Sequence, residues 1–345
     1  MPGADLLGSI LSVSSMNRLA IKVFFVVFSA VPLVAAQGNV VNPKPGVTAV
    51  QAPFASLRPS ATFKIGRTAD WVLVTDDAIW VTGTRPYSLQ RIDPATNTIV
   101  AKVRLSGEAC AGLAFGFGSV WVPICGNRPL LDRVDSETNR ITAVLPIATA
   151  GPEAGITASS DSIWMVTDKD GTTLSRIDPA TNKVRQRTTI PEGSYNPLSS
   201  GNTIWITGFH KNILTDIDAA SGEVLASIPV GPKPRFLTSG GGSVWTLNQG
   251  DGSVTRVDID SRKAMATVDL GIPGPGGDLA YGAGFVWAST MGLPITVIEG
   301  GTNRLRRQWV GRGGDALRFG YESILLTDYH RGLLWRIPFQ VTQQP

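Results

Sequence analysis

Few residues in this 345-residue sequence have types and spacings that could support chemistry. Asp328 and His330 lie two residues apart and could form an acid–base pair. An exposed loop histidine is the simpler interpretation of the same residues. The stretch Lys233-Pro234-Arg235-Phe236 could bind an anion such as a carboxylate, or it could be an ordinary connecting loop. Neither pattern identifies a reaction.

Several enzyme classes lack the motifs that they need in this sequence. We find no serine nucleophile elbow, no glycine-rich phosphate loop and no metal-spaced histidine cluster. With two cysteines and two histidines in total, a structural zinc site is not expected. We therefore assign no catalytic residue and no cofactor from the sequence, and the metal content stays open.

The two cysteines, Cys110 and Cys125, flank a predicted β-hairpin. A tight turn centred on Phe117-Gly118 would place them directly opposite each other on antiparallel strands. Opposed positions lie about 5 Å apart, which is within disulfide range. We expect a disulfide, with two buried thiols as the alternative.

A repeated phrase organises the rest of the chain. Short β-type runs recur with a period near 40 residues, and six of them carry a tryptophan at the same place: Trp80, Trp121, Trp164, Trp205, Trp245 and Trp287. Leu325 takes this place in a seventh copy. Such a period is typical of propeller blades with four strands each. The sequence predicts an all-β protein, a seven-bladed β-propeller of four-stranded antiparallel blades, with residues 61–65 closing the last blade.

The repeated residues have structural explanations. An identical large ring in successive blades suits packing between blades better than ligand stacking. The repeated aspartates precede turns, mostly as Asp-Pro-Ala-Thr-Asn, where aspartate bonds its own backbone and proline presets φ. They are Asp93, Asp135, Asp178, Asp218 and Asp258.

The N-terminal region is predicted to direct export. Residues 1–36 have a basic segment, an apolar segment and a small-residue cleavage site, as in a signal peptide. Translation starting at Met16 is an alternative for this region. We expect residues 37–60 to form an extended arm, residues 61–340 the propeller and residues 341–345 a tail. The mature protein is then periplasmic or secreted, without a membrane span, and we expect a monomer.

The charge pattern argues against nucleic acid as a partner. The formal net charge is +4, and the basic residues are scattered without a basic run. Blades of the form Gly-Ser-Val-Trp-Val followed by Arg-Ile-Asp-Pro-Ala-Thr-Asn resemble exported YVTN-type propellers and the virginiamycin B (streptogramin) lyase superfamily. The resemblance covers nearly all of residues 61–340 and implies the fold.

The lyase activity needs residues that this sequence lacks at the matching positions. The resemblance implies a glutamate three residues after one blade tryptophan and a histidine that opens one innermost strand. The seven corresponding residues are Gly83, Ile124, Thr167, Gly208, Asn248, Thr290 and Asp328. None is glutamate, and no innermost strand begins with histidine.

The candidate site is a ring of non-repeating residues at one mouth of the channel. They precede the innermost strands or lie in loops on the same rim: Asp70, Glu153, Asn196, Arg235, Asp278, Asp315, Asp328 and His330. Variable residues on a repeating scaffold favour specific binding. We expect a module that binds a small molecule, peptide or protein. A metal-dependent lyase- or lactonase-like enzyme is the alternative, with Ca²⁺ or Mg²⁺ on these carboxylates; solvated aspartates paired with Arg235 and Arg312 are the simplest interpretation.

Overall fold

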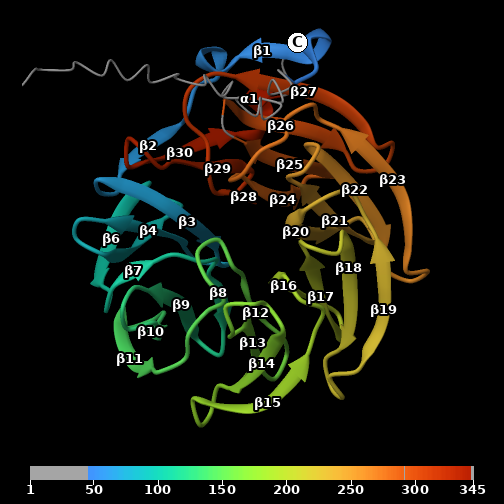
Figure 1. Ribbon diagram of the computed structural model, residues 1–345. Coiled ribbons are helices and arrows are strands. Elements are labelled where there is room, and N and C mark those ends of the chain that lie inside the picture. The colour runs from blue at the N-terminus through green and yellow to red at the C-terminus, as the bar shows by residue number, and fades with distance from the viewer. Residues whose placement is uncertain (1–45, 291, 343–345) are drawn as a thin grey trace, which may run out of the picture. The chain divides into compact units, whose positions relative to one another are not determined.

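The computed structural model describes residues 46–290 and 292–342. The expected signal peptide and the arm before residue 46 lie outside this range. Within it, seven small sheets follow one another around a ring (Figure 1). The predicted seven-bladed β-propeller is confirmed. None of the helices in the described ranges is long and apolar enough to cross a membrane.

Each blade runs from an innermost strand at the channel to an outermost strand at the periphery. The first blade consists of β3 (Thr68–Val74), β4 (Ile79–Thr84), β5 (Ser88–Asp93) and β6 (Thr98–Arg104). The second consists of β7 (Glu108–Ala109), β8 (Ala114–Gly116), β9 (Ser119–Cys125), β10 (Leu130–Asp135) and β11 (Arg140–Leu145). The third consists of β12 (Ile156–Ala158), β13 (Ile163–Val166), β14 (Thr173–Asp178) and β15 (Lys183–Thr189). The fourth consists of β16 (Ser194–Ser200), β17 (Thr203–Gly208), β18 (Ile213–Asp218) and β19 (Val224–Pro229).

The last three blades complete the ring. The fifth consists of β20 (Pro234–Gly240), β21 (Ser243–Asn248), β22 (Ser253–Asp258) and β23 (Lys263–Asp269). The sixth consists of β24 (Asp278–Gly282), β25 (Phe285–Thr290), β26 (Leu293–Glu299), β27 (Arg304–Val310) and the added β1 (Gln51–Pro53). The seventh consists of β28 (Leu317–Gly320), β29 (Ser323–Asp328), β30 (Leu333–Pro338) and β2 (Ala61–Lys64). The described helices are short: η1 (Thr48–Val50), η2 (Phe54–Ser56) and α1 (Phe339–Thr342).

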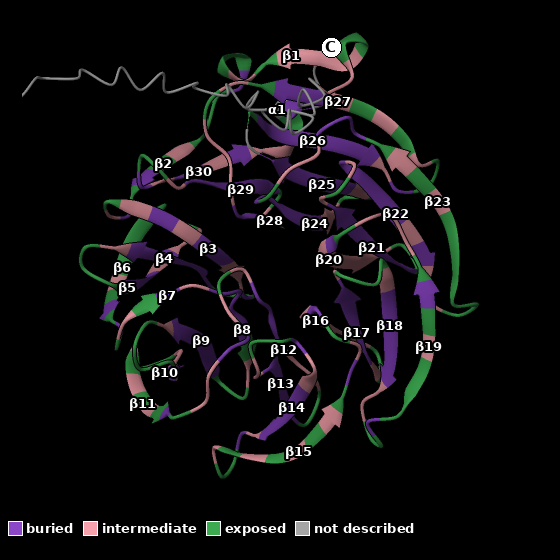
Figure 2. Ribbon diagram, in the orientation of Figure 1, coloured by how far each residue is buried: buried purple, intermediate pink, exposed green. Residues whose placement is uncertain are grey.

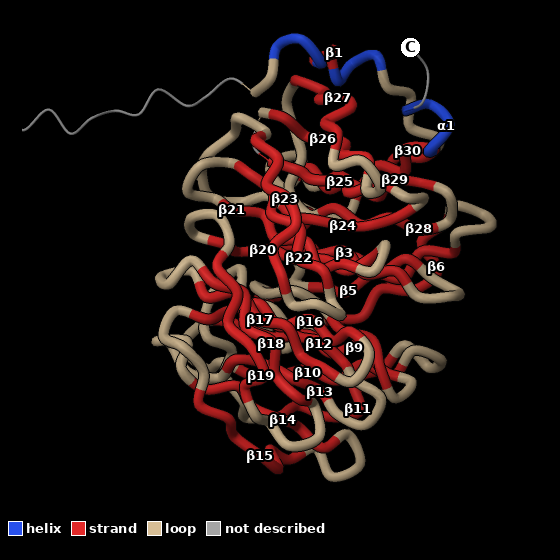
Figure 3. The backbone as a smooth tube through the Cα atoms, turned by 90° about the vertical axis from the view of Figure 1, so that its right-hand side faces the viewer, coloured by secondary structure: helices blue, strands red, loops and turns tan. Residues whose placement is uncertain are grey.

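Burial changes across each blade. The second strands, such as β13 and β21, are buried throughout, whereas the outermost strands β15 and β23 alternate between exposed and half-buried residues (Figure 2). A side view shows the strands crossing the thickness of the ring, with loops on both rims (Figure 3). The core therefore lies between neighbouring blades, and the rims are left to loops.

The repeated tryptophans pack between the blades, as predicted. All six are fully buried. In four blades the arginine of the third strand lies over the tryptophan ring, with its guanidinium carbon 4.8–5.6 Å from the centroid: Arg91 on Trp80, Arg133 on Trp121, Arg176 on Trp164 and Arg256 on Trp245. A guanidinium over an indole face is attracted by the ring quadrupole.

Three of these arginines, Arg133, Arg176 and Arg256, also join one blade to the next, whereas Arg91 pairs with Asp77 of its own blade. Arg133 donates to the Pro179 carbonyl and to Asn182 Oδ1, at 2.5 and 3.0 Å, in the turn of the third blade. Arg336 of the last blade makes the same two bonds to Pro94 and Asn97 of the first blade, at 2.5 and 2.7 Å. The repeated turn thus reverses the chain between two strands and also accepts hydrogen bonds from the arginine of the preceding blade.

The turn aspartates behave as predicted. Asp93 Oδ1 accepts a 2.8 Å bond from the Ala95 amide, and Asp178 Oδ1 accepts a 2.8 Å bond from the Ala180 amide. These bonds are the main cause of the lowered pKa of both carboxyl groups.

The N-terminal segment closes the ring across blades six and seven. β2 pairs antiparallel with β30, so that Phe63 lies opposite Leu334 and is buried. Before it, β1 pairs parallel with β27, and Phe54 contacts the Trp335 ring at a centroid distance of 5.2 Å. The arm expected at residues 37–60 is therefore packed against the propeller from residue 46 onward.

Removing one side chain should test this closure. We expect Phe63→Ala to lower the free energy of unfolding by about 3–5 kcal/mol, the usual cost of deleting a buried phenylalanine ring. Thr62→Ala, on the exposed side of β2, should change it by less than about 0.5 kcal/mol. Urea titration of both variants is the measurement, and equal stabilities would contradict the closure by β2.

Candidate functional site

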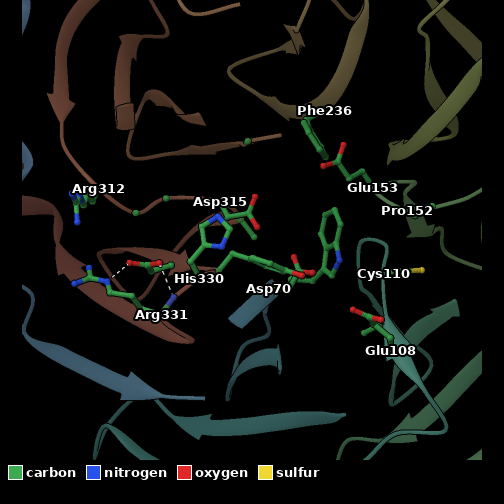
Figure 4. Close-up of a pocket in the computed structure, with 18 of the residues that line it drawn as sticks. Asp70, Glu108, Cys110, Pro152, Glu153, Phe236, Arg312, Asp315, His330 and Arg331 are labelled. Atoms are coloured by element: carbon green, nitrogen blue, oxygen red, sulfur yellow. Dashed lines mark hydrogen bonds and ion pairs between the residues drawn. The ribbon is translucent and has the colours of Figure 1, made fainter. Parts of the chain in front are cut away.

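A pocket of about 800 Å³ opens at one mouth of the central channel (Figure 4). It brings together five of the eight predicted site residues, from blades one, three and seven: Asp70, Glu153, Asp315, Asp328 and His330. Glu108 of the second blade lines the same pocket. The predicted rim is therefore hollowed, and carboxyl groups from four blades surround the hollow.

Two aromatic rings form the floor of this pocket. Trp71 of β3 and Phe236 of β20 line both the mouth pocket and a second cavity of about 440 Å³ deeper in the channel. Their ring centroids are 6.4 Å apart, and both residues are buried. The rings therefore separate the two cavities. The Trp71 indole N–H is buried and has no hydrogen-bond partner among the described residues, although a buried indole usually has one.

Bulges in the innermost strands direct several of these residues. In β3, Asp70 and Trp71 together face the single residue between Gly83 and Val81 on β4. The register shifts in the same way in β16, at Tyr195 and Asn196, and in β20, at Arg235. A bulge bends the strand and redirects its side chains. Sequence spacing alone does not reveal this redirection.

The carboxyl groups of the pocket raise one another's pKa. Burial raises the pKa of Asp315 to about 7, helped by the charges of Asp278 and Glu153 and opposed by a hydrogen bond from the Gly277 amide. Burial also raises the pKa of Asp70 well above its usual range, and the charge of Asp315 is the next largest cause.

Asp70 has no compensating partner in the described part of the chain. No hydrogen bond or ion pair joins its carboxyl group to another described residue. The negative field also reaches Tyr329, whose pKa is raised mainly by burial and further by Asp70, Glu108 and Asp315. The pocket is therefore short of positive charge on the side where these carboxyl groups lie.

Glu153 occupies a strained backbone position. Its φ is +61°, in the left-handed region that favours glycine, and its amide donates to the Cys110 carbonyl at 2.8 Å. A side chain there costs about 1–2 kcal/mol, and such strain is concentrated at functional sites. The glutamate side chain at this position places a carboxylate at the pocket wall.

Asp328 and His330 do not form the possible acid–base pair, in agreement with the simpler interpretation of an exposed loop histidine. Asp328 accepts a 2.5 Å bond from Arg331 Nε and a 3.1 Å bond from the Arg331 amide. His330 is exposed, and its ring lies edge-on to Tyr329 at 5.4 Å. Asp328 is thus neutralised by its own loop, and His330 reaches the pocket independently.

Three predicted residues lie outside the mouth pocket. Asn196 and Asp278 line the deeper cavity instead. Asp278 is 3% exposed and accepts bonds from Arg318 and from the Leu317 amide, so that it joins blade six to blade seven. Arg235 lies over the Tyr195 ring at 4.4 Å.

Arg235 nevertheless supports the pocket wall. Its Nη2 donates a 2.9 Å bond to the Pro152 carbonyl, next to Glu153. Among the described residues, neither Arg235 nor Arg312 forms an ion pair with a carboxylate of the mouth. The expectation that these two arginines neutralise the ring is therefore wrong.

The disulfide between Cys110 and Cys125 is confirmed, with a Cα–Cα distance of 5.7 Å. The predicted turn is also correct, because Gly116 pairs with Ser119. The cysteines are not directly opposed, however, since Glu108 pairs with Cys125. Residues 110–113 interrupt the innermost strand between β7 and β8. Because of this interruption, the pairing of β7 with β9 is shifted by two residues from the pairing of β8 with β9, and Glu108 lines the pocket.

The carboxyl groups surround the pocket without meeting at a point. No three His, Cys, Asp or Glu side chains within residues 46–290 and 292–342 are grouped closely enough to hold a metal ion. A bare Ca²⁺ prefers six to eight oxygen ligands in one shell. The arrangement therefore suits a larger cation better than a bare metal ion.

Sequence reasoning missed Glu108, Trp71 and Phe236. Glu108 was displaced by the interruption of the second blade, which no residue spacing indicates. Trp71 and Phe236 resemble ordinary apolar residues of inner strands. The only signal for them was that each directly follows a predicted ring residue, Asp70 or Arg235.

Comparison of the sequence with protein-family models and with curated proteins finds no match in either. The structure shows the fold of the chain, a seven-bladed β-propeller.

The disulfide should stabilise the wall that carries Glu108. The cysteines are 15 residues apart, and closing a loop of that size contributes about 3 kcal/mol in the chain-entropy model. We expect the double variant Cys110→Ser, Cys125→Ser to lose about this much free energy of unfolding. Guanidinium titration measures it, and an unchanged midpoint would contradict the prediction.

The raised pKa of Asp315 should make stability depend on pH. A carboxyl group whose pKa is higher in the folded state stabilises the fold below pH 4, and this contribution is lost as the pH rises towards 7. We expect Asp315→Asn to match the wild type at pH 4 and to be up to about 4 kcal/mol more stable at pH 8, because each pKa unit corresponds to about 1.4 kcal/mol.

The exposed Asp170 on the same rim provides the control. Asp170→Asn should keep the pH dependence of the wild type in the same urea titrations. An Asp315→Asn variant that follows the wild type at both pH values would show that this carboxyl group carries no burial penalty.

Proposed function

We propose that this propeller is a binding module that takes an organic cation, such as an amine, into the acidic mouth of its channel. The unpaired carboxyl group of Asp70 carries the proposal. It is partly buried, lacks a partner among the described residues, and lies among Glu108, Glu153 and Asp315. A buried charge without a partner is costly, and a cationic ligand would remove that cost.

The floor of the pocket agrees with this ligand class. Trp71 and Phe236 present aromatic rings below the carboxyl groups, and aromatic faces attract ammonium groups and cover their methylene chains. Carboxyl groups spread over several blades match a ligand whose positive charge is distributed over several N–H or N–CH₃ groups. Bound ammonium would also lower the raised pKa of Asp70 and Asp315.

The chain's other features fit an exported protein of this kind. A disulfide persists in oxidising compartments. We propose a periplasmic or secreted location, in keeping with the signal-peptide pattern of residues 1–36 and with the resemblance to exported YVTN-type propellers.

Proton transfer in the same pocket is a second candidate function. Asp315 has a pKa of about 7, which suits a general acid or base at neutral pH. It replaces metal-dependent chemistry as the enzymatic alternative, because the described residues group no three metal ligands. Turnover of a lactone or ester that is lost in Asp315→Asn would favour it.

Calorimetric titration with propylamine, putrescine and choline tests the proposed function. We expect at least one of them to bind, and Asp70→Asn to weaken it about tenfold or more, because the variant removes the unpaired charge. Affinity should rise as the pH increases through about 7, where Asp315 loses its proton.

Two comparisons make this test decisive. Asp170→Asn removes an exposed carboxylate of the same rim outside the pocket and should leave the affinity unchanged. Mg²⁺ titrated alone should give no saturable heat. Binding of Mg²⁺ together with no response to any amine would overturn the proposal in favour of a metal site.

A further inference from the structure

One wall of the mouth pocket is a loop with a single side chain. Residues 311–314, Gly311-Arg312-Gly313-Gly314, connect β27 to β28, and all four line the pocket. The loop faces parts of the N-terminal arm, the sixth blade and the seventh blade. It therefore belongs to the seam that β1 and β2 close.

Packing requires each of the three glycines. A Cβ atom at Gly311 would lie 2.8 Å from Phe54 Cβ, and one at Gly314 would lie 2.7 Å from Pro294 Cα. At Gly313 it would lie 2.7 Å from the Trp335 ring. Gly313 and Gly314 also have φ values of +102° and +89°. The backbone is thus fixed closely against its surroundings, and only position 312 offers a side chain to the pocket.

Arg312 is a cation without a partner in the described part of the chain. It is exposed, and no hydrogen bond or ion pair joins it to another described residue. Arg331 nearby differs, since it bonds to Asp328 and lies over the Trp335 ring at 5.0 Å. In Figure 4, Arg312 lies on the opposite side of the pocket from Glu108 and Glu153.

The pocket therefore carries opposite charges on its two sides. Asp70 and its neighbouring carboxyl groups lack a cation at one end, and Arg312 lacks an anion at the other. Opposite charges in one pocket normally pair with each other, but among the described residues no ion pair joins Arg312 to a carboxylate of the mouth. A ligand that carries both charges would complete both ends at once.

We propose that the ligand is a zwitterion, with an ammonium group at Asp70 and a carboxylate at Arg312. This rests on the proposed function, because it takes the acidic wall as the ammonium site. The guanidinium offers a planar fork of donors that matches a carboxylate in a bidentate geometry. Arg312 then determines specificity, since it distinguishes an amino acid-like ligand from a simple amine of the same length.

A series of ω-amino acids of increasing chain length, together with their primary amides, tests this proposal. Each amide keeps the ammonium group but lacks the carboxylate charge. For the best-fitting length, we expect the free acid to bind the wild type about tenfold more tightly than its amide. Arg312→Gln should remove this difference by weakening the acid alone. Calorimetry gives the four affinities, and thermal denaturation checks that the variant is folded.

Lys233→Gln supplies the matched control. Lys233 is an exposed cation on the same rim outside the pocket lining, so that its removal should leave the preference for the acid intact. Loss of the preference in Lys233→Gln instead of Arg312→Gln would place the anion at the fifth blade and overturn the assignment. Equal binding of acid and amide by the wild type would also overturn it.

The N-acetylated ω-amino acids separate this inference from the proposed function. They keep the carboxylate but have no ammonium group, and we expect no binding. If amides bind and acids gain nothing, only the zwitterion is excluded. If N-acetyl derivatives bind as well as the amines do, or if no amine binds, the cation site and the zwitterion are both excluded.

Discussion

The bridge from a third-strand arginine to the turn of the following blade organises this propeller. Arg133 lies over Trp121 of its own blade and donates to Asn182 of the next. One side chain therefore connects the packing within a blade to the contact between blades. Arg336 repeats the bridge onto Asn97, so that the last blade is joined to the first. Arg176 and Arg256 make corresponding contacts with the turns of the fourth and sixth blades.

Because the bridges hold the outer parts of the blades, the channel side is free to vary. The innermost strands carry bulges in three blades and an interruption in a fourth. Each irregularity redirects side chains into the mouth without disturbing the second strand, where the tryptophan packs. Blades built on one repeated pattern thus surround a mouth whose side chains do not repeat with the blades.

The fold was predictable because its determinants repeat along the sequence. Trp80 and its counterparts, and the turns after Asp93 and Asp178, recur at one period and need no long-range information. The site was predicted only in part, because its members depend on contacts between distant segments. Asp278 looked like a rim residue, yet Arg318 of the next blade draws it into the channel wall. Glu108 was missed since the interruption of its strand leaves no trace in residue spacing.

The antiparallel pairing of β2 with β30 also constrains the order of assembly. Ala61 lies opposite Arg336, so one of the first strands to be synthesised must wait for one of the last. Until then the seventh blade lacks its outermost strand, and both partners present unpaired backbone edges. A chain that ends before residue 333 would lack β30, so that β2 and β29 would each be left with an unpaired edge.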